Sequence, residues 1–151
     1  MDHAAIDDYL ARYAQTLARF DATAAAGLWA EPGMIVDDRF SGVLDDRAAM
    51  ARGLERSYPL YRALGLASVG HELLDTTFLT GAIALVHVRW LFRDAEGAPL
   101  TDSTAYYIVR EEDDGLHACV CVQVDDAAKL QALAAARGVD LAQFLPDGPP
   151  A

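Results

Sequence analysis

Apolar and polar residues alternate along the second half of the chain. The alternation starts near Gly65 and ends near Asp125, and it has the period of two that is typical of half-buried strands. It predicts four strands, at about residues 66 to 79, 82 to 93, 99 to 111 and 116 to 125. The turns between them contain residues that tolerate positive φ: Gly81, Gly97 and Gly115. We therefore expect an antiparallel meander of four strands.

The front third of the chain has a helical period instead. Within residues 3 to 20, apolar side chains recur three and four positions apart, at Ile6, Leu10, Tyr13, Leu17 and Phe20. This spacing predicts one helix with a single apolar stripe.

A second, shorter helix is expected directly afterwards. Asp21 caps its start, and Pro32-Gly33 stops it, so that Trp29 lies near its end and points inward. Residues 34 to 40 are then predicted to form a short strand.

A third helix is predicted from Asp45-Asp46 to Gly65, and Pro59 should kink it or mark its last turn. The meander must curl and bury one face, and the N-terminal helices are the elements that can cover this face. The fold class is therefore α+β, a cone in which three N-terminal helices pack on a strongly curved, mostly antiparallel sheet.

Chain length limits the number of domains. With 151 residues, of which 53% are hydrophobic, the chain suffices for one domain and is too short for two. We place a single domain at residues 1–138 and a C-terminal tail at residues 139–151.

Turn lengths assign the strand residues to two faces. Hairpin loops with an even number of residues pair odd positions on one strand with even positions on the next. The predicted core face consists of His71, Leu73, Val86, Val88, Trp90, Phe92, Ala105, Tyr107, Val109, Val120, Val122 and Val124. The opposite face mixes Leu85 and Leu91 with polar groups, and a sheet face of this kind often meets a second copy of itself. We expect a homodimer through the sheet.

The charge of the chain makes some partners unfavourable. It has 12 Lys plus Arg against 23 Asp plus Glu, and the net charge of −11 repels nucleic acids and anionic membranes. The N-terminus lacks the basic start and apolar core of a signal peptide, and no apolar run reaches membrane-spanning length. We therefore expect a cytoplasmic protein that binds neither nucleic acid nor membranes. Its two cysteines lie two residues apart on one strand, a poor geometry for a disulfide, and are expected to be reduced.

The order of the predicted elements resembles the NTF2-like superfamily, and in particular its SnoaL-like and ketosteroid isomerase-like small proteins. The resemblance covers about residues 5 to 125. It is carried by Ala11-Arg12-Tyr13, Phe20-Asp21, Leu28-Trp29-Ala30, Val36-Asp37-Asp38 and the hairpin into Gly115. It implies a ligand pocket inside the cone, although members of this superfamily differ widely in function.

Ketosteroid isomerases have a tyrosine on the first helix, a carboxylate base on the first strand and a protonated acid on the third strand of the meander. Laid on that pattern, Tyr13 takes the position of the tyrosine. An ungapped match selects Asp37 as the base, whereas matching Val-x-Asp selects Asp38. Tyr107 stands where the second acid is expected, and its phenol is still able to donate a hydrogen bond to an oxyanion.

These four residues suggest removal of a proton next to a carbonyl group. Desolvation in an apolar cone raises the pKa of a carboxylate base, and tyrosine donors stabilise the enolate that forms. The same residues also have a structural interpretation, in which the aspartates face solvent or bond a turn and the phenols reach water.

Further residues are predicted to contact the ligand. His71 points into the cavity, where it acts as a base or orients the ligand. Trp29 and Trp90 pack the wall or stack on a planar ligand. The rest of the predicted wall consists of Met50, Val88, Val120 and Val122.

Metals and cofactors are not expected. His117, Cys119 and Cys121 share a face, but along an extended strand they spread over more than about 12 Å, too far for one zinc ion. The predicted function is therefore binding of a small apolar or aromatic ligand, with isomerase, cyclase or lyase chemistry. The alternative is a non-catalytic dimeric ligand carrier or interaction module whose cone is filled by its own side chains.

Overall fold

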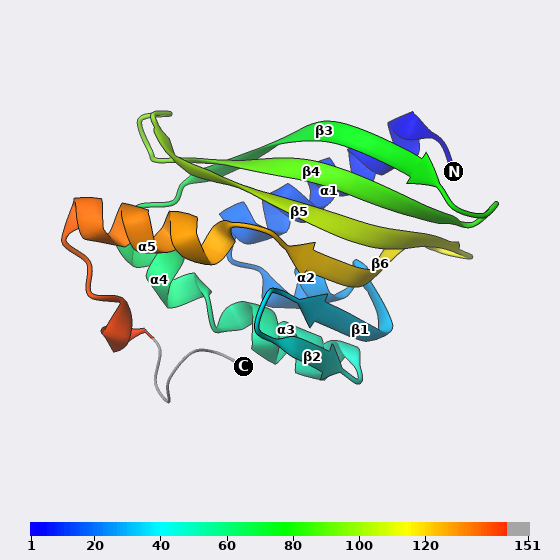
Figure 1. The fold of residues 1–151 in the computed structure, drawn as a ribbon, viewed down its shortest axis with the longest axis horizontal. Helices are drawn as coiled ribbons and strands as arrows, with labels where there is room; N and C mark the ends of the chain where they lie inside the picture. Colours follow the sequence, from blue (N-terminus) through cyan, green and yellow to red (C-terminus); the bar gives the residue numbers. More distant parts are fainter. Residues whose placement is uncertain (145–151) are drawn as a thin grey trace.

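A six-stranded sheet forms the frame of the protein (Figure 1). The computed structural model describes residues 1–144. The strands are β1 (Trp29–Val36), β2 (Ser41–Leu44), β3 (Ser68–Phe78), β4 (Ile83–Arg93), β5 (Pro99–Glu112) and β6 (Gly115–Gln123), in the order β2-β1-β6-β5-β4-β3. Neighbouring strands are antiparallel except for β1 and β6, which run parallel. The predicted meander and the α+β class are confirmed.

The helices are α1 (His3–Ala18), α2 (Ala22–Ala26), α3 (Arg47–Glu55), α4 (Tyr58–Ala63) and α5 (Asp126–Arg137), followed by the short 3₁₀ helix η1 (Leu141–Gln143). Asp2, Asp21 and Asp46 each begin a helix by accepting a backbone N–H three residues ahead. Within residues 1–144, none of the helices has the length and apolar composition that crossing a membrane requires.

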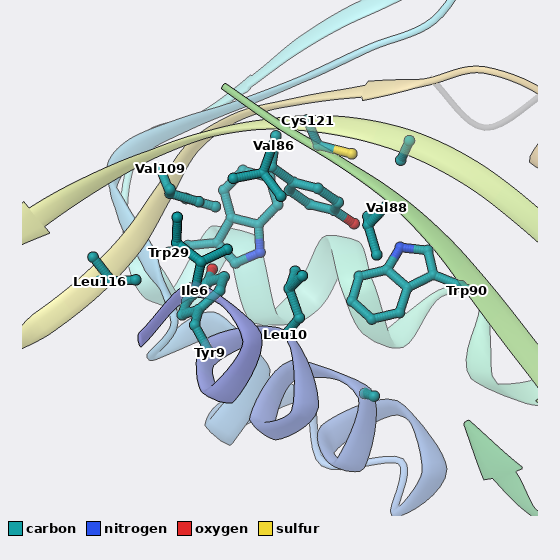
Figure 2. Packing of buried hydrophobic residues seen from close by; sticks show 14 of the residues in the cluster. Ile6, Tyr9, Leu10, Trp29, Val86, Val88, Trp90, Val109, Leu116 and Cys121 are labelled. Atoms are coloured by element: carbon teal, nitrogen blue, oxygen red, sulfur yellow. The ribbon is translucent and has the colours of Figure 1, made fainter. Parts of the chain in front are cut away.

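The core lies between α1 and the inner face of the sheet. Figure 2 shows Ile6 and Leu10 of α1 directed toward Val86 and Val88 of β4. All four side chains are buried, and each contributes roughly 1.5 to 3 kcal/mol of transfer free energy. The apolar stripe read from the sequence is therefore the face that α1 turns to the sheet.

The second predicted helix is shorter than expected. It ends at Ala26, and Trp29 is the first residue of β1 instead of the end of a helix. Pro32 and Gly33, predicted to stop the helix, lie inside that strand, where Glu31-Pro32 is a cis peptide bond. The strand expected at residues 34 to 40 therefore begins earlier and ends at Val36.

The third predicted helix is two helices. α3 ends at Glu55, and α4 begins at Tyr58 with Pro59 in its first turn. Proline fits there because the first N–H groups of a helix have no intrahelical partner. Four helices therefore precede the meander, one more than predicted.

A β-bulge makes part of the predicted core face wrong. Val109 pairs with Ala118 but Ile108 pairs with Val120, so Cys119 is an extra residue without a partner on β5. An extra residue reverses the facing of every later side chain on the strand. Cys121 is consequently buried in the core.

Val120 and Val122 are therefore on the outer face of β6, and Val122 is 38% exposed. The prediction that they form the inner wall, together with Val124, is wrong. Val124, which follows the strand, is also exposed.

The chain after α5 packs back onto the helices. Val139, Leu141 and Phe144 contact a small buried cluster formed by Leu60, Leu64 and Ala134. This contact joins α5 to α4 at one end of the sheet (Figure 1). The remainder of the predicted tail, residues 145–151, lies outside the described residues.

Candidate functional site

A cavity of about 130 Å³ lies between the inner face of the sheet and the helices. Its walls come from helices α1 to α4, strands β3 to β6 and the start of α5. Six of the lining side chains are aromatic: Tyr13, Tyr58, Tyr61, Trp90, Phe92 and Tyr107. Apolar cavities near this size enclose a molecule such as benzene. The cavity is therefore suited to a small, flat, largely apolar molecule.

Three of the aromatic rings contact one another. The ring centroid of Tyr13 lies 5.8 Å from that of Trp90 and 6.0 Å from that of Tyr107. Trp90 and Tyr107 are 6.1 Å apart and nearly perpendicular, at 86°, an arrangement that the charge distribution of aromatic rings favours. The structure thus brings together three of the residues predicted for the site.

The hydroxyl group of Tyr13 is the best-defined hydrogen-bonding group of the cavity. Its oxygen accepts a hydrogen bond from Nε1 of Trp29, at 3.1 Å. Burial raises the pKa of Tyr13, and the bond from Trp29 acts in the opposite direction. Within residues 1–144, the phenol hydrogen has no protein acceptor. Tyr13 is therefore a neutral donor that is free to bond a ligand.

Asp126 is the one acidic residue among the described residues that line the cavity. It is the first residue of α5 and is half-buried. Burial raises the pKa of Asp126, and the negative charges of Asp37 and Asp125 raise it further. A raised pKa makes the ionised carboxylate a stronger base than a carboxylate in water.

The other described side chains that line the cavity are uncharged. Tyr61 lines the same cavity, and its pKa is raised by burial and by the charge of Asp126. Burial raises the pKa of the Cys121 thiol to about 12, so this cysteine stays protonated. The described residues that line the cavity include no arginine, lysine or histidine. An anionic ligand would therefore lack a compensating charge.

Asp37 and Asp38 do not line the cavity. Both are exposed, because β1 ends at Val36 and the chain turns immediately afterwards. Oδ1 of Asp37 accepts the backbone N–H groups of Arg39 and Phe40, at 2.8 and 2.9 Å. The prediction that one of these aspartates faces into the hollow is therefore wrong.

The other predicted contact residues divide between wall and core. Trp90 lines the cavity, whereas Trp29, Met50 and Val88 are buried outside its lining. His71 faces the inside of the cone but also lies outside the lining, because its Nε2 is 2.8 Å from Oδ1 of Asp7 on α1. His71 therefore ties the helix to the sheet.

Asp126 is the residue that the sequence interpretation missed. No local pattern distinguishes Asp125-Asp126 from the other acidic pairs of the chain, such as Asp7-Asp8 and Asp45-Asp46. The parallel pairing of Val36 with Val122 ends β1 beside the start of α5, which brings Asp37 close to Asp126. The available signal was its position directly after the last predicted strand.

The fold and the cavity define a cone-shaped α+β protein with a small internal site. Residues 3–126 match the family model described as NTF2-like protein (DUF6841), and the chain belongs to this family. No curated protein matches the chain.

Solved structures show the same fold. An NTF2-like protein with a cystatin-like fold from Novosphingobium aromaticivorans has a TM-score of 0.62 and 24% identity, over 87% of this chain and 88% of that chain. A domain of unknown function with a cystatin-like fold from Nostoc punctiforme has a TM-score of 0.65 and 17% identity, over 82% and 76%. A ketosteroid isomerase-like protein from Erwinia carotovora atroseptica has a TM-score of 0.60 and 13% identity, over 80% and 93%. At these identities the likeness is one of fold.

Proposed function

We propose that the cavity binds a small, uncharged ring compound with a carbonyl group and that Asp126 removes a proton from the carbon next to that group. The observation that carries this proposal is the placement of a desolvated carboxyl group and the free phenol donor of Tyr13 on the wall of one aromatic cavity. This assignment keeps the chemistry predicted from the sequence but transfers the role of the base from Asp37 or Asp38 to Asp126.

The proton transfer requires one base and one donor. Ionised Asp126 takes the proton from carbon, the electron pair of the C–H bond moves toward the carbonyl group, and an enolate forms. Tyr13 donates its hydrogen bond to the enolate oxygen, where negative charge develops. Return of the proton to a different carbon completes an isomerisation, and the same enolate serves a cyclase or lyase.

The cavity wall also limits the class of ligand. Six aromatic side chains favour a flat apolar ring, and the absence of a basic group among the described lining residues disfavours carboxylates and phosphates. The volume of about 130 Å³ limits the enclosed part of the ligand to about one six-membered ring.

Hydrogen exchange at carbon tests the proposal directly. In D₂O, the protein should accelerate the loss of the α-proton signals of cyclohexanone, followed by ¹H NMR. Asp126→Asn should slow this exchange by about 100-fold or more, the usual contribution of a general base. Tyr13→Phe should also slow it, because one oxyanion donor is lost.

Asp38→Asn is the matched control, because Asp38 is an exposed aspartate just after β1, at the end of the strand that lies beside Asp126. This variant should exchange at the wild-type rate. Full activity in Asp126→Asn, or loss of activity in Asp38→Asn, would refute the assignment of the base.

The alternative function, a non-catalytic carrier or interaction module, is favoured by the size of the cavity. Most ligand pockets measure roughly 300 to 1,000 Å³, and this cavity is smaller. Saturable binding of cyclohexanone or phenol without any exchange would support the carrier. Binding is followed by the fluorescence of the protein, because Trp90 lines the cavity and Trp29 bonds Tyr13.

We also propose that a second copy of the chain covers the outer face of the sheet. Val122 pairs with Tyr106, and Tyr106 stacks on His87 with ring centroids 4.0 Å apart, so a row of one valine and two stacked rings crosses three strands. Exposed Val122 and Val124 continue the apolar surface beside it. Sedimentation should give a dimer at high micromolar concentration, and Val122→Glu should give a monomer. A monomeric wild-type protein would contradict the proposal.

A further inference from the structure

The tip of the β5–β6 hairpin carries a cluster of potential metal ligands that the cavity does not use. One nitrogen of His117 and one carboxylate oxygen from each of Glu112 and Asp114 lie within 4.8 Å of one another. Glu112 ends β5, Asp114 is in the two-residue turn, and His117 is on β6. We propose that these three side chains bind a divalent transition-metal ion, with zinc as its simplest representative.

The buried state of His117 distinguishes this cluster from an ordinary acidic turn. Only 4% of the His117 side chain is exposed, and its Nδ1 has no hydrogen-bond partner within residues 1–144. Oε1 of Glu112 lies 2.8 Å from this nitrogen but outside the direction of a hydrogen bond. A buried polar nitrogen without a partner is costly, and a coordinated ion would satisfy it.

The distances suit a shared ion. Zinc lies about 2.0 to 2.2 Å from nitrogen and oxygen ligands, so two ligands of one ion are roughly 3 to 3.5 Å apart. Nδ1 of His117 is 2.8 Å from Oε1 of Glu112, and one ligand atom from each of the three residues lies within 4.8 Å of the others. The 3.6 Å contact of Asp114 is to Nε2, and one ion binds only one of the two ring nitrogens, so Asp114 has to turn toward Nδ1 to share the ion. Asp114 is 74% exposed, and its side chain is therefore free to adjust. Three protein ligands leave further positions for water.

Arg110 orients the carboxylate of Glu112 for metal binding. Its guanidinium group donates two hydrogen bonds to Oε2 of Glu112, at 2.7 and 3.2 Å, and leaves Oε1 toward His117. Outer hydrogen bonds of this kind orient metal-bound carboxylates. The positive charge of Arg110 lowers the affinity for a cation, so we expect binding in the micromolar range.

The ligand types select the class of ion. One imidazole nitrogen and two carboxylate oxygens suit zinc, nickel or cobalt, whereas magnesium and calcium prefer oxygen ligands alone. This set of ligands differs from His117, Cys119 and Cys121, the three residues that the sequence places on one strand face. The bulge turns Cys121 to the inner face, away from His117.

Calorimetric titration of the metal-free protein with Zn²⁺ at neutral pH tests the site. The wild type should bind one ion and unfold at a higher temperature with Zn²⁺ than with EDTA. His117→Gln and Asp114→Asn should each weaken binding at least 10-fold and remove the thermal shift. Asp114 is exposed, so its variant stays informative if the buried His117 variant fails to fold.

Two controls separate this site from other ways of binding zinc. Asp113→Asn changes an exposed neighbouring acid and should bind like the wild type. Equal weakening in Asp113→Asn would indicate diffuse attraction to an acidic surface and would overturn the proposal. Cys119→Ser should also bind normally. A thiolate charge-transfer band in the Co²⁺ complex, or no binding to the wild type, would overturn the proposal as well.

Discussion

The indole nitrogen of Trp29 donates a hydrogen bond to the hydroxyl oxygen of Tyr13, at 3.1 Å. This contact joins the first residue of β1 to the middle of α1, and Trp29 is only 1% exposed. The indole N–H has one direction in which to donate, so the position of Tyr13 is coupled to that of Trp29. The donor that faces the cavity is thus fixed by a side chain outside the cavity lining.

Tyr13→Phe should destabilise the fold. The substitution leaves the buried N–H of Trp29 without an acceptor, which costs about 1 to 3 kcal/mol of unfolding free energy. Urea unfolding monitored by tryptophan fluorescence measures the loss. Tyr106→Phe removes a phenol oxygen from the outer face and is the matched control, with an expected change below about 0.5 kcal/mol. Equal stability of the Tyr13 variant and the wild type would show that the bond contributes nothing.

Asp126 should make the folded protein less stable as the pH rises. Because burial raises the folded-state pKa of Asp126, the folded state holds this proton more tightly than the unfolded state does. The stabilisation is complete below the ordinary value of 3.8 and is lost as the pH rises through the folded pKa. Asp126→Asn cannot ionise, so it should become more stable relative to the wild type as the pH rises. Urea unfolding across that range tests this, and a difference independent of pH would contradict it.

The two cysteines should react at very different rates. Cys121 is 3% exposed, and burial raises the pKa of its thiol to about 12. Cys119, on the bulge, is partly exposed, and burial raises the pKa of its thiol less. Iodoacetamide should therefore modify Cys119 in the native protein and Cys121 only after unfolding. Peptide mapping by mass spectrometry distinguishes the two. Rapid labelling of native Cys121 would contradict the inward facing of this residue.

Much of the fold follows from local periodicity. The four meander strands differ from the predicted ranges by at most two residues at each end, because alternation and turn residues are short-range signals. The prediction of which face of β4 is buried was also correct: Val86, Val88 and Trp90 are buried, as their spacing predicted. The bulge at Cys119 has no such signal, and a single extra residue was enough to exchange the faces of Val120 and Cys121.

The candidate site was only partly predictable for a related reason. Tyr13, Trp90 and Tyr107 lie on elements whose faces the sequence pattern defines, and the structure brings them together. The carboxyl group depends on the parallel pairing of β1 with β6 and on where α5 begins, which are long-range features. Family position pointed to Asp37 or Asp38, whereas the cavity lining contains Asp126.

Gly33, the single glycine of β1, should not tolerate a larger side chain. A Cβ atom at this position would lie 2.7 Å from Cε3 of Trp29 and 2.8 Å from Cε of Met50. Trp29 and Met50 are each 1% exposed, so neither has free space into which to move. Gly33→Ala should therefore destabilise the fold by about 1 to 3 kcal/mol, the usual cost of overpacking a core.

The same substitution should also disturb the cavity, because Trp29 holds the hydroxyl of Tyr13. Gly81→Ala is the matched control, since a Cβ there meets no atom within 4 Å and the residue has no positive φ. Urea unfolding should place the control within about 0.5 kcal/mol of the wild type. If Gly33→Ala is equally stable, Trp29 and Met50 are more loosely packed than their burial indicates. The Tyr13 donor would then not be held rigidly.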